Sequence, residues 1–382
     1  MRLKYIEDIV KQESKHNQIV CGDTFLCERT IENTEFVLCD GIGSGIYANI
    51  AALTCANRLI ELFRTGVSLR YACEKVADSM HRARKEEIPF SAFSVAKILN
   101  DGQFTVYTYE APIPILIKDG RAQPLKPYFY TASYEIIGES SGTLGIGDAL
   151  VLCSDGATQA GLGNGYFFGI EVEGVADYIN TRLTYGGNLF DLPQEIIKMC
   201  CKVSGGNYAD DITVAVLKCR EAAQLTVMSG PPSVKTKDPV ITKRFISSPG
   251  TRVVCGSTTA DILSRELHKE AKLVPGSATY GAPPEYTMDG VDMVTEGAAM
   301  LNQVYNILGE NPEQFIEDTA TERLCSLMQG ADVVSFLLGT AVNEAHTALL
   351  FKQMGIRPRA ATIKLISEQL KKMGKLVVEE YY

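Results

Sequence analysis

The sequence predicts an α+β fold for the first part of the chain, followed by a second, smaller α/β domain. Between residues 92 and 118, apolar residues recur with a period of two in three consecutive segments, which is typical of hairpins. Helical patterns precede this block from about residue 45, and beyond about residue 221 the order becomes strand, loop, helix. Hairpins bracketed by helices favour antiparallel sheets with helices outside them.

The first elements are a short strand over residues 36–39 and a glycine-rich turn over 41–45. A helix follows as far as Gly66, and Ser68 caps a second helix. The second helix carries Leu69, Ala72, Val76 and Met80. The apolar stripe expected to bury the first helix is Ile46, Ile50, Leu53, Leu59, Leu62 and Phe63.

Three hairpin strands are then expected, separated by turn residues at Asn100-Asp101-Gly102 and Glu110-Ala111-Pro112. Two further strands fit apolar runs nearer the end of this block. The five segments are residues 93–99, 104–109, 113–118, 149–153 and 212–218.

The pattern breaks near Arg220, so the sequence predicts domains at 1–220 and 221–382. In the second domain Asn311 is expected to cap a helix with Pro312 at its first position. The expected strands are 224–228, 252–255, 333–338 and 375–379, and the expected helices follow Gly256 and cover 291–308, 312–328 and 360–373.

Composition is that of an ordinary soluble protein, with 46% hydrophobic and 22% charged residues in 382. A net charge of −9 without a long basic run argues against nucleic acid as a partner. No apolar run reaches the roughly 18 residues of a membrane span, and the N-terminus lacks a signal-peptide core. The eleven cysteines, an odd number in apolar surroundings, indicate reduced thiols and a cytoplasmic location.

Four short stretches place aspartates where hard cations could be held. They are Gly22-Asp23-Thr24-Phe25, the segment from Cys39-Asp40-Gly41 to Gly45, Cys153-Ser154-Asp155-Gly156, and Ala209-Asp210-Asp211-Ile212-Thr213. Mg²⁺ and Mn²⁺ take carboxylate, carbonyl and water oxygens. An Asp-Gly pair is more often a plain turn, as expected at Asp101 and Asp119, so spacing alone leaves both interpretations open.

Residues 22–218 resemble the PPM (type 2C) superfamily of metal-dependent protein phosphatases, and within it the bacterial stage II sporulation protein E subgroup. The four aspartate stretches carry the resemblance, the third extending from Gly147 to Ala160, because they occur in the family's order. The resemblance implies an α-β-β-α sandwich and hydrolysis of phosphoserine or phosphothreonine in a protein. It also implies two Mn²⁺ or Mg²⁺ ions and in-line attack by a hydroxide that bridges them.

By the same resemblance, the catalytic aspartates are Asp40, Asp155 and Asp210. Asp40 would bridge both metals, and the Gly41 carbonyl would bind one of them. Asp155 and Asp210 would bind the other, and Asp23 would hold a coordinated water. No residue is expected to bind an organic cofactor.

Two positions depart from the family pattern. Ile42 stands where many eukaryotic members have a histidine that is thought to protonate the leaving alkoxide, although the sporulation subgroup generally lacks it too. The usual Asn-Ala-Gly-His-like turn is here Glu110-Ala111-Pro112-Ile113, which affects substrate contacts rather than the metals.

Several interpretations stay open. Asp211 is either an outer contributor to the metal site or a strand cap, and the two helices after Asp40 are either regulatory helices or simple core packing. His81, His268 and His346 are expected to be ordinary helix or loop residues.

In the second domain, the loop at Gly256-Ser257-Thr258-Thr259 either cradles an anion or caps a helix. If it meets the polar loop from Leu338 to His346, the two form a ligand pocket.

The sequence therefore predicts a metal-dependent protein serine/threonine phosphatase. Its expected partner is a phosphorylated regulatory protein such as an anti-sigma-factor antagonist, and a homodimer and a small-molecule ligand of the second domain are further expectations. The alternatives are a phosphatase-like scaffold without turnover and a hydrolase of small phosphoesters.

Overall fold

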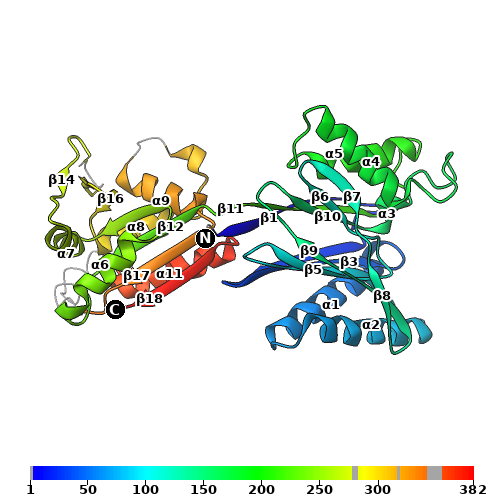
Figure 1. Ribbon diagram of the computed structural model, residues 1–382, viewed down its shortest axis with the longest axis horizontal. Coiled ribbons are helices and arrows are strands. Elements are labelled where there is room, and N and C mark those ends of the chain that lie inside the picture. The colour runs from blue at the N-terminus through cyan, green and yellow to red at the C-terminus, as the bar shows by residue number, and fades with distance from the viewer. Residues whose placement is uncertain (1–2, 278–282, 316–318, 342–354) are drawn as a thin grey trace. The chain divides into compact units, whose positions relative to one another are not determined.

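The computed structural model describes residues 3–277, 283–315, 319–341 and 355–382 of the chain. The chain divides into two compact units, Met1–Glu221 and Ala222–Tyr382 (Figure 1). None of the helices in the described ranges combines the length and the apolar character that a membrane span requires.

The first unit contains two antiparallel sheets. One has the strand order β1-β11-β10-β6-β7, and the other has the order β2-β3-β4-β5-β9-β8. The strands of the first sheet are β1 (Lys4–Glu13), β6 (Ile115–Lys118), β7 (Arg121–Pro124), β10 (Ala149–Cys153) and β11 (Ile212–Glu221). Those of the second are β2 (Asp23–Arg29), β3 (Asn33–Gly41), β4 (Ser91–Leu99), β5 (Gln103–Tyr109), β8 (Tyr128–Ala132) and β9 (Glu135–Thr143).

The two sheets pack face to face, and helices cover both outer faces (Figure 1). Phe36 and Leu38 of one sheet meet Leu150, Leu152 and Leu217 of the other in the central core. The outer helices are α1 (Gly45–Arg64) and α2 (Leu69–Lys85) on the six-stranded sheet, and α4 (Glu171–Thr184) and α5 (Leu192–Val203) on the five-stranded sheet. The predicted α+β sandwich is confirmed.

Helix α1 buries a different face from the predicted one. Its buried side is made of small residues, such as Ala48, Ala52 and Cys55, followed by Leu59. Ile46, Ile50 and Leu53 are exposed, so the first half of the predicted stripe was wrong. Small side chains let the helix lie close to strands β2 and β3, which is why they occupy the inner face. Helix α2 begins as predicted, because the Ser68 side chain accepts a hydrogen bond from the Tyr71 N–H.

The second unit is a three-layer α/β structure around a seven-stranded sheet of order β14-β15-β16-β13-β12-β17-β18. The five strands from β16 to β18 are parallel, whereas β14 and β15 are antiparallel. The strands are β12 (Gln224–Ser229), β13 (Thr251–Cys255), β14 (Lys272–Leu273), β15 (Glu285–Met288), β16 (Val291–Thr295), β17 (Val333–Leu338) and β18 (Leu376–Tyr381).

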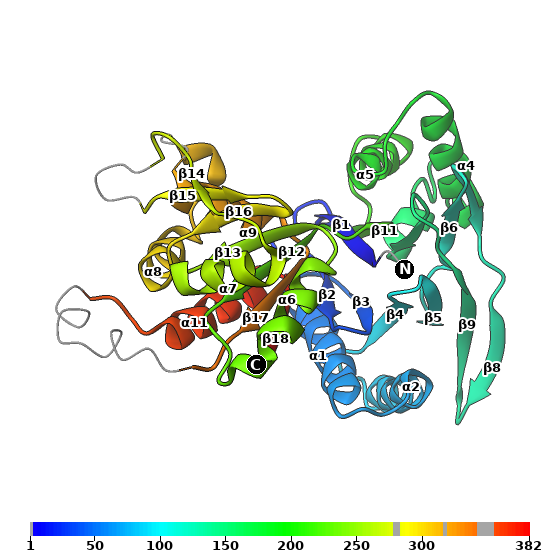
Figure 2. The ribbon, with the colours of Figure 1, turned by 60° about the vertical axis from the view of Figure 1, so that its left-hand side comes forward.

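Helices lie on both faces of this sheet, as Figure 2 shows. Helices α8 (Ala298–Ile307), α9 (Ala320–Gly330) and α11 (Arg359–Lys372) pack on one face. Helices α6 (Asp238–Ile246) and α7 (Ser257–Leu267) pack on the other. Short 3₁₀ turns cover Lys235–Lys237 and Pro312–Gln314.

Two helix predictions in this unit were wrong in extent. The segment expected as one helix over 291–308 starts with strand β16, because its apolar residues continue the parallel sheet beside β13. The helix expected from Pro312 is only a 3₁₀ turn with Asn311 as its cap, and α9 starts later with Thr319 and Glu322 as a capping box.

Candidate metal centre

Asp23 and Asp40 lie opposite each other on neighbouring strands. Asp23 is the first residue of β2 and pairs in register with Asp40, the penultimate residue of β3. Directly opposed residues of an antiparallel pair have Cβ atoms about 5 Å apart. Strand pairing therefore brings together two carboxylates that are 17 positions apart in the sequence.

Asp155 and Asp210 reach the same end of the sandwich from the other sheet. Asp155 opens the short helix α3 (Asp155–Thr158) directly after β10, and Asp210 precedes β11, which pairs with β10. The backbone N–H of Thr213 donates to Ser154 Oγ over 2.8 Å. The end of β10 and the start of β11 are thus fixed beside each other.

A hydroxyl bridge joins the two sheets at this edge. Thr213 Oγ1 donates to Asp23 Oδ2 over 2.6 Å, and Gln12 Nε2 donates to Thr213 Oγ1 over 2.9 Å. Asp23 is only 3% exposed. The bridge holds a buried carboxylate of one sheet against the first residues of the other, so all four segments meet at one site.

Burial and mutual repulsion disfavour the charged forms of these carboxyl groups. Burial, followed by the charges of Asp23 and Asp155, raises the pKa of Asp40 to about 10. Burial raises the pKa of Asp23 to about 6, with Thr213 acting in the opposite direction. Burial also raises the pKa of Asp155. Without cations, Asp40 therefore retains its proton at neutral pH.

The remaining contacts show which carboxylate oxygens are already used. Gln159 Nε2 donates to Asp155 Oδ2 over 2.8 Å, and Lys15 Nζ lies 3.4 Å from Asp210 Oδ1. In contrast, Asp23 Oδ1 is buried with no hydrogen-bond partner in the described structure. A buried carboxylate oxygen without a donor is costly unless something else satisfies it, and a cation or its water is suited to that.

The residues present fit small hard cations, since the four aspartates and the Gly41 carbonyl offer oxygen ligands. Gly41 is packed so closely that a Cβ atom there would overlap the Ala48 carbonyl, so this position requires glycine. Within the ranges described, no three His, Cys, Asp or Glu side chains already form a compact metal-binding group. Asp40 is central to the cluster, since the charges of Asp23, Asp155 and Asp210 all act on its carboxyl group.

Asp211 has a structural partner. Its Oδ1 accepts the Lys15 backbone N–H over 2.9 Å, and the residue is buried. A Cβ atom on Gly22 would lie 2.8 Å from its Oδ2, so this carboxylate packs against the segment that leads into Asp23. It anchors the loop before β2 to the start of β11.

Four residues that contact the aspartates had no role predicted from the sequence: Lys15, Gln159, Ser154 and Thr213. Ser154 and Thr213 lie inside the quoted aspartate motifs. Their hydroxyl groups could have indicated that they form hydrogen bonds at this site. Gln159 also lies inside the third motif, four residues after Asp155, so its spacing would have been the indication. Lys15 lacks any such pattern, because its contact with Asp210 arises only when the strands are paired.

Two histidines have other contacts or places in the fold. His81 Nδ1 pairs with Glu135 Oε1, and its ring stacks on Tyr134 at 5.3 Å between centroids. His268 ends helix α7 in the left-handed conformation. His346 lies outside the described residues. Ile42, at the position of the eukaryotic histidine, is partly exposed.

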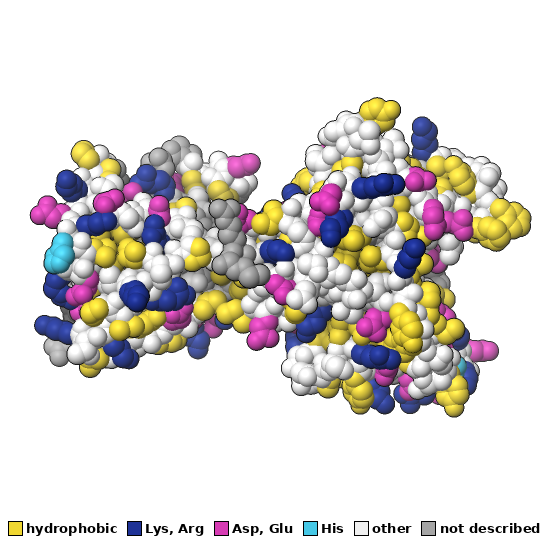
Figure 3. All heavy atoms as spheres, in the orientation of Figure 1, with side chains coloured by type: hydrophobic (Ala, Val, Ile, Leu, Met, Phe, Trp, Pro, Cys, Tyr) yellow, Lys and Arg dark blue, Asp and Glu magenta, His cyan; other side chains and the backbone are white. Residues whose placement is uncertain are grey.

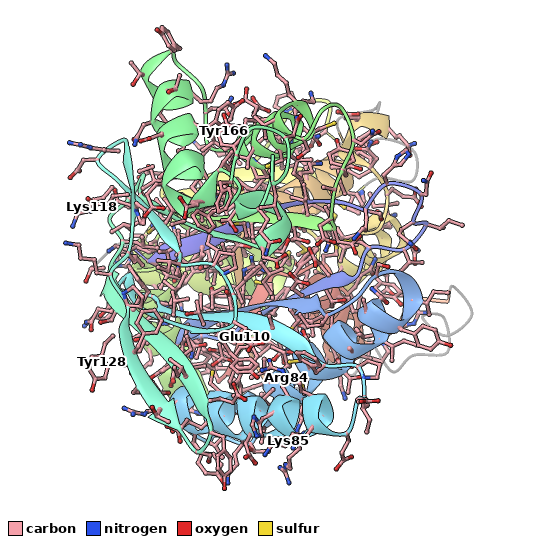
Figure 4. The ribbon with its side chains drawn as sticks, turned by 90° about the vertical axis from the view of Figure 1, so that its right-hand side faces the viewer. Arg84, Lys85, Glu110, Lys118, Tyr128 and Tyr166 are labelled. Atoms are coloured by element: carbon pink, nitrogen blue, oxygen red, sulfur yellow. The ribbon has the colours of Figure 1, made fainter. Side chains whose placement is uncertain are left out.

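The turn after β5, which departs from the family pattern, is held by an ion pair. Arg84 of α2 pairs with Glu110, and Figure 4 shows the two side chains beside each other. The Arg84 guanidinium also lies over the Phe90 ring at 4.6 Å. This turn is thus tied to α2.

An exposed aromatic loop follows helix α3. Phe167 and Phe168 are 86% and 68% exposed, with their rings edge to face at 4.7 Å. Hydrophobic side chains gather at this loop between α3 and α4 in Figure 3. The Ile170 N–H donates to the Ala160 carbonyl over 3.0 Å, so the loop closes on the residues directly after α3.

Comparison with known proteins relates the first unit to a family. Residues 31–220 match the model of the stage II sporulation protein E (SpoIIE) family. No curated protein matches the chain.

Solved structures with similarity to the chain include the following three. The PP2C phosphatase domain of SpoIIE from Bacillus subtilis, with a fragment of its regulatory domain, has 15% identity and a TM-score of 0.49, covering 58% of this chain and 65% of that one. The RsbU and RsbW domains of a Mycobacterium tuberculosis protein have 16% identity and a TM-score of 0.49, covering 64% and 69%. RsbX in complex with magnesium has 17% identity and a TM-score of 0.41, covering 56% and 99%. The chain thus spans less than two thirds of the length of the SpoIIE structure.

Proposed function

We propose, from the premise that this chain belongs to the stage II sporulation protein E family of PP2C-type phosphoprotein phosphatases, that it is a metal-dependent protein serine/threonine phosphatase. The observation that carries the proposal is the meeting of Asp23, Asp40, Asp155 and Asp210 at one end of the sandwich. They come from separate segments of both sheets, and three of them have raised pKa values. A protein gains no stability from such a cluster unless it binds cations.

The ligand roles proposed for these residues follow their places in the fold. Asp40 would contact both of two Mn²⁺ or Mg²⁺ ions, the Gly41 carbonyl one of them, and Asp155 and Asp210 the other. Asp23 would orient a coordinated water with the oxygen that lacks a donor. When bound, the cations would lower the pKa of the attacking water and neutralise the phosphoryl oxygens.

Other residues of the chain would hold this arrangement in place. Thr213 fixes one oxygen of Asp23, and Gln159 fixes one oxygen of Asp155. Lys15 would balance part of the charge of Asp210. Since Ile42 has no proton to give, the leaving alkoxide would take its proton from water.

A protein is the proposed substrate, and the aromatic loop over 161–169 supports this. Two adjacent exposed phenylalanines beside a catalytic centre are suited to contact a macromolecular surface, whereas a small phosphoester would not reach them. We propose a phosphorylated regulatory protein of the cytoplasm, such as an anti-sigma-factor antagonist, as the partner.

Hydrolysis of para-nitrophenyl phosphate tests the metal centre. The full chain should be active with Mn²⁺ or Mg²⁺ and inactive with EDTA, and Asp40→Asn should be inactive with either ion while keeping its circular dichroism spectrum. Near-normal activity of folded Asp40→Asn would contradict the ligand assignment. Activity of the wild type in EDTA would contradict the metal requirement.

A further inference from the structure

The parallel sheet of the second unit changes the direction of its winding at β12. The chain passes from β12 to β13 and then to β16 on one side, and later continues with β17 and β18 on the other side. The connections that leave β12 and β17 therefore diverge at the carboxyl ends of these neighbouring strands. In open parallel sheets this divergence creates a crevice in which ligands bind.

Three loops meet at this edge around Gly230, which directly follows β12. The Gly230 N–H donates to Thr259 Oγ1, in the first turn of α7, over 2.8 Å. On the other side, the Gly339 N–H donates to the Ser229 carbonyl over 3.1 Å. A Cβ atom on Gly339 would overlap the carbonyls of Gly230 and Pro231. The loops after β13 and β17 thus both contact the end of β12.

The guanidinium of Arg359 lies across these glycines. It packs so closely on Gly230 that a Cβ atom there would overlap it, and Nη2 donates to the Gly339 carbonyl over 2.6 Å. Arg359 is the first residue of α11, so helix and loop together fix its position. The charge of this side chain is held at the point where the connections diverge.

Arg359 has no acidic partner among the described residues. Arg244, Arg265 and Arg323 of the same unit are paired with Glu380, Asp238 and Glu285. Burial lowers the pKa of Arg359, since the guanidinium is partly withdrawn from water. A partly desolvated charge that no described carboxylate pairs with is unfavourable, and an anion placed beside it would remove that cost.

The start of α7 offers further donors to an anion. Its N-cap is Gly256, no side chain caps its first N–H groups, and no acidic residue lies in its first turn. The hydroxyls of Ser257 and Thr258 are exposed there, while the buried Thr259 is engaged with Gly230. Free N–H groups and hydroxyls at a helix start are suited to phosphate oxygens.

We infer that the second unit binds the phosphate monoester of a small molecule in this crevice, between Arg359 and the first turn of α7. The guanidinium fork and the helix start supply donors for the three terminal oxygens of such a group. The inference depends on the second unit alone and not on the proposed phosphatase activity.

A pyrophosphate-bearing dinucleotide fits less well. Its site needs a glycine-rich turn leading directly into a helix after the first strand. Here Pro231 and Pro232 follow Gly230, and proline has no N–H to donate. Helix α6 starts only at Asp238, which places a carboxylate in its first turn.

Isothermal titration of the full chain with AMP and with inorganic phosphate, in EDTA, tests the inference. EDTA leaves the first unit with only its repelling carboxylates, so binding reports on the second unit. We expect one saturable site, and Arg359→Gln should weaken binding by at least about tenfold because a charge-assisted, forked contact is lost. Arg357→Gln is the matched control, because this exposed arginine lies over the Tyr305 ring and should leave affinity unchanged.

Ser257→Asp provides a second, independent variant. A carboxylate in the first turn favours the helix, so the protein should stay folded, but it should repel the anion and abolish binding. The inference is overturned if neither probe binds the wild type, or if Arg359→Gln and Ser257→Asp bind as tightly as Arg357→Gln. Should Arg359→Gln fail to fold, Ser257→Asp alone decides between these outcomes.

Discussion

Replacing Asp40 with asparagine should remove most of the pH dependence of stability that the metal-free protein shows between pH 6 and 8. The pKa of Asp40 is raised from 3.8 to about 10 by burial and by its acidic neighbours. In the unfolded chain this carboxyl group is ionised throughout the interval, whereas in the folded chain it keeps its proton. The folded state thus binds one proton more, and its stability falls as the pH rises.

The magnitude follows from the proton difference. One extra proton in the folded state changes the free energy of unfolding by about 1.4 kcal/mol per pH unit, or about 2.7 kcal/mol from pH 6 to pH 8. This value is an upper limit, because Asp40 is only partly buried and because the proton is shared within the carboxylate cluster. Asp40→Asn keeps the shape of the side chain but cannot ionise, so only the smaller contribution of Asp23, near pH 6, should remain in its slope.

Urea unfolding in EDTA at pH 6, 7 and 8, followed by far-ultraviolet circular dichroism, measures the slope. Asp119→Asn is the matched control, because Asp119 is exposed in a turn with a φ of 50°, a conformation that asparagine also adopts readily. The control should keep the wild-type slope, and Asp40→Asn should be the more stable protein at pH 8. If wild type and Asp40→Asn show parallel pH dependences, the carboxylate cluster does not retain the proton.

Three further outcomes are expected. Titration with Mn²⁺ should show an affinity that rises by up to about tenfold per pH unit between pH 6 and 8, since Asp40 must lose its proton to bind a cation. An affinity that does not change with pH would contradict the role of Asp40 as a metal ligand. Phe168→Ser should lower kcat/KM for a phosphoprotein but not for para-nitrophenyl phosphate. Tyr185→Ser is the control, because Tyr185 is also exposed but lies about 20 Å away at the other end of α4, and it should change kcat/KM for neither substrate. Leu59→Ala should lower the free energy of unfolding by about 3 kcal/mol, and Ile50→Ala by less than about 0.5 kcal/mol, in thermal or urea unfolding. A larger loss for Ile50→Ala than for Leu59→Ala would mean that the face predicted from the sequence is the buried one.

The strands that lead to the aspartates could be predicted from the sequence because they are uniformly apolar. Residues 36–39 and 149–153 are fully buried, and a buried strand followed by Asp and Gly is visible in the sequence itself. Strand β1 gave no such pattern. Its ten residues include Lys4, Glu7 and Asp8, and it pairs along its whole length with β11, a partner that only the fold identifies.

Helix faces were harder to predict than strand ends. In α1 the larger apolar residues Ile46, Ile50 and Leu53 have the spacing of a buried stripe, yet the close approach of the helix to the sheet selects Ala48 and Ala52 for the inner side. Hydrophobic spacing reports which residues share a face, but the space between helix and sheet decides which face is buried.

The candidate metal centre could likewise be predicted only in part. Its aspartates could be recognised because each follows or precedes a strand within a short motif. Lys15 and Thr213, which orient them, could not, because they act on residues far away in the sequence.

The energetics of the site argue that the carboxylates are kept for a purpose other than folding. Asp23 is almost fully buried, one of its oxygens has no donor in the described structure, and Asp40 lies directly opposite it on the next strand. An apolar or amide residue at either position would avoid the desolvation and repulsion that raise both pKa values. The sandwich core, formed by residues such as Phe36 and Leu150, does not depend on these charges. Cations that bind the folded but not the unfolded chain would offset the desolvation and repulsion of these carboxylates. Metal binding should therefore stabilise the first unit as well as enable its chemistry.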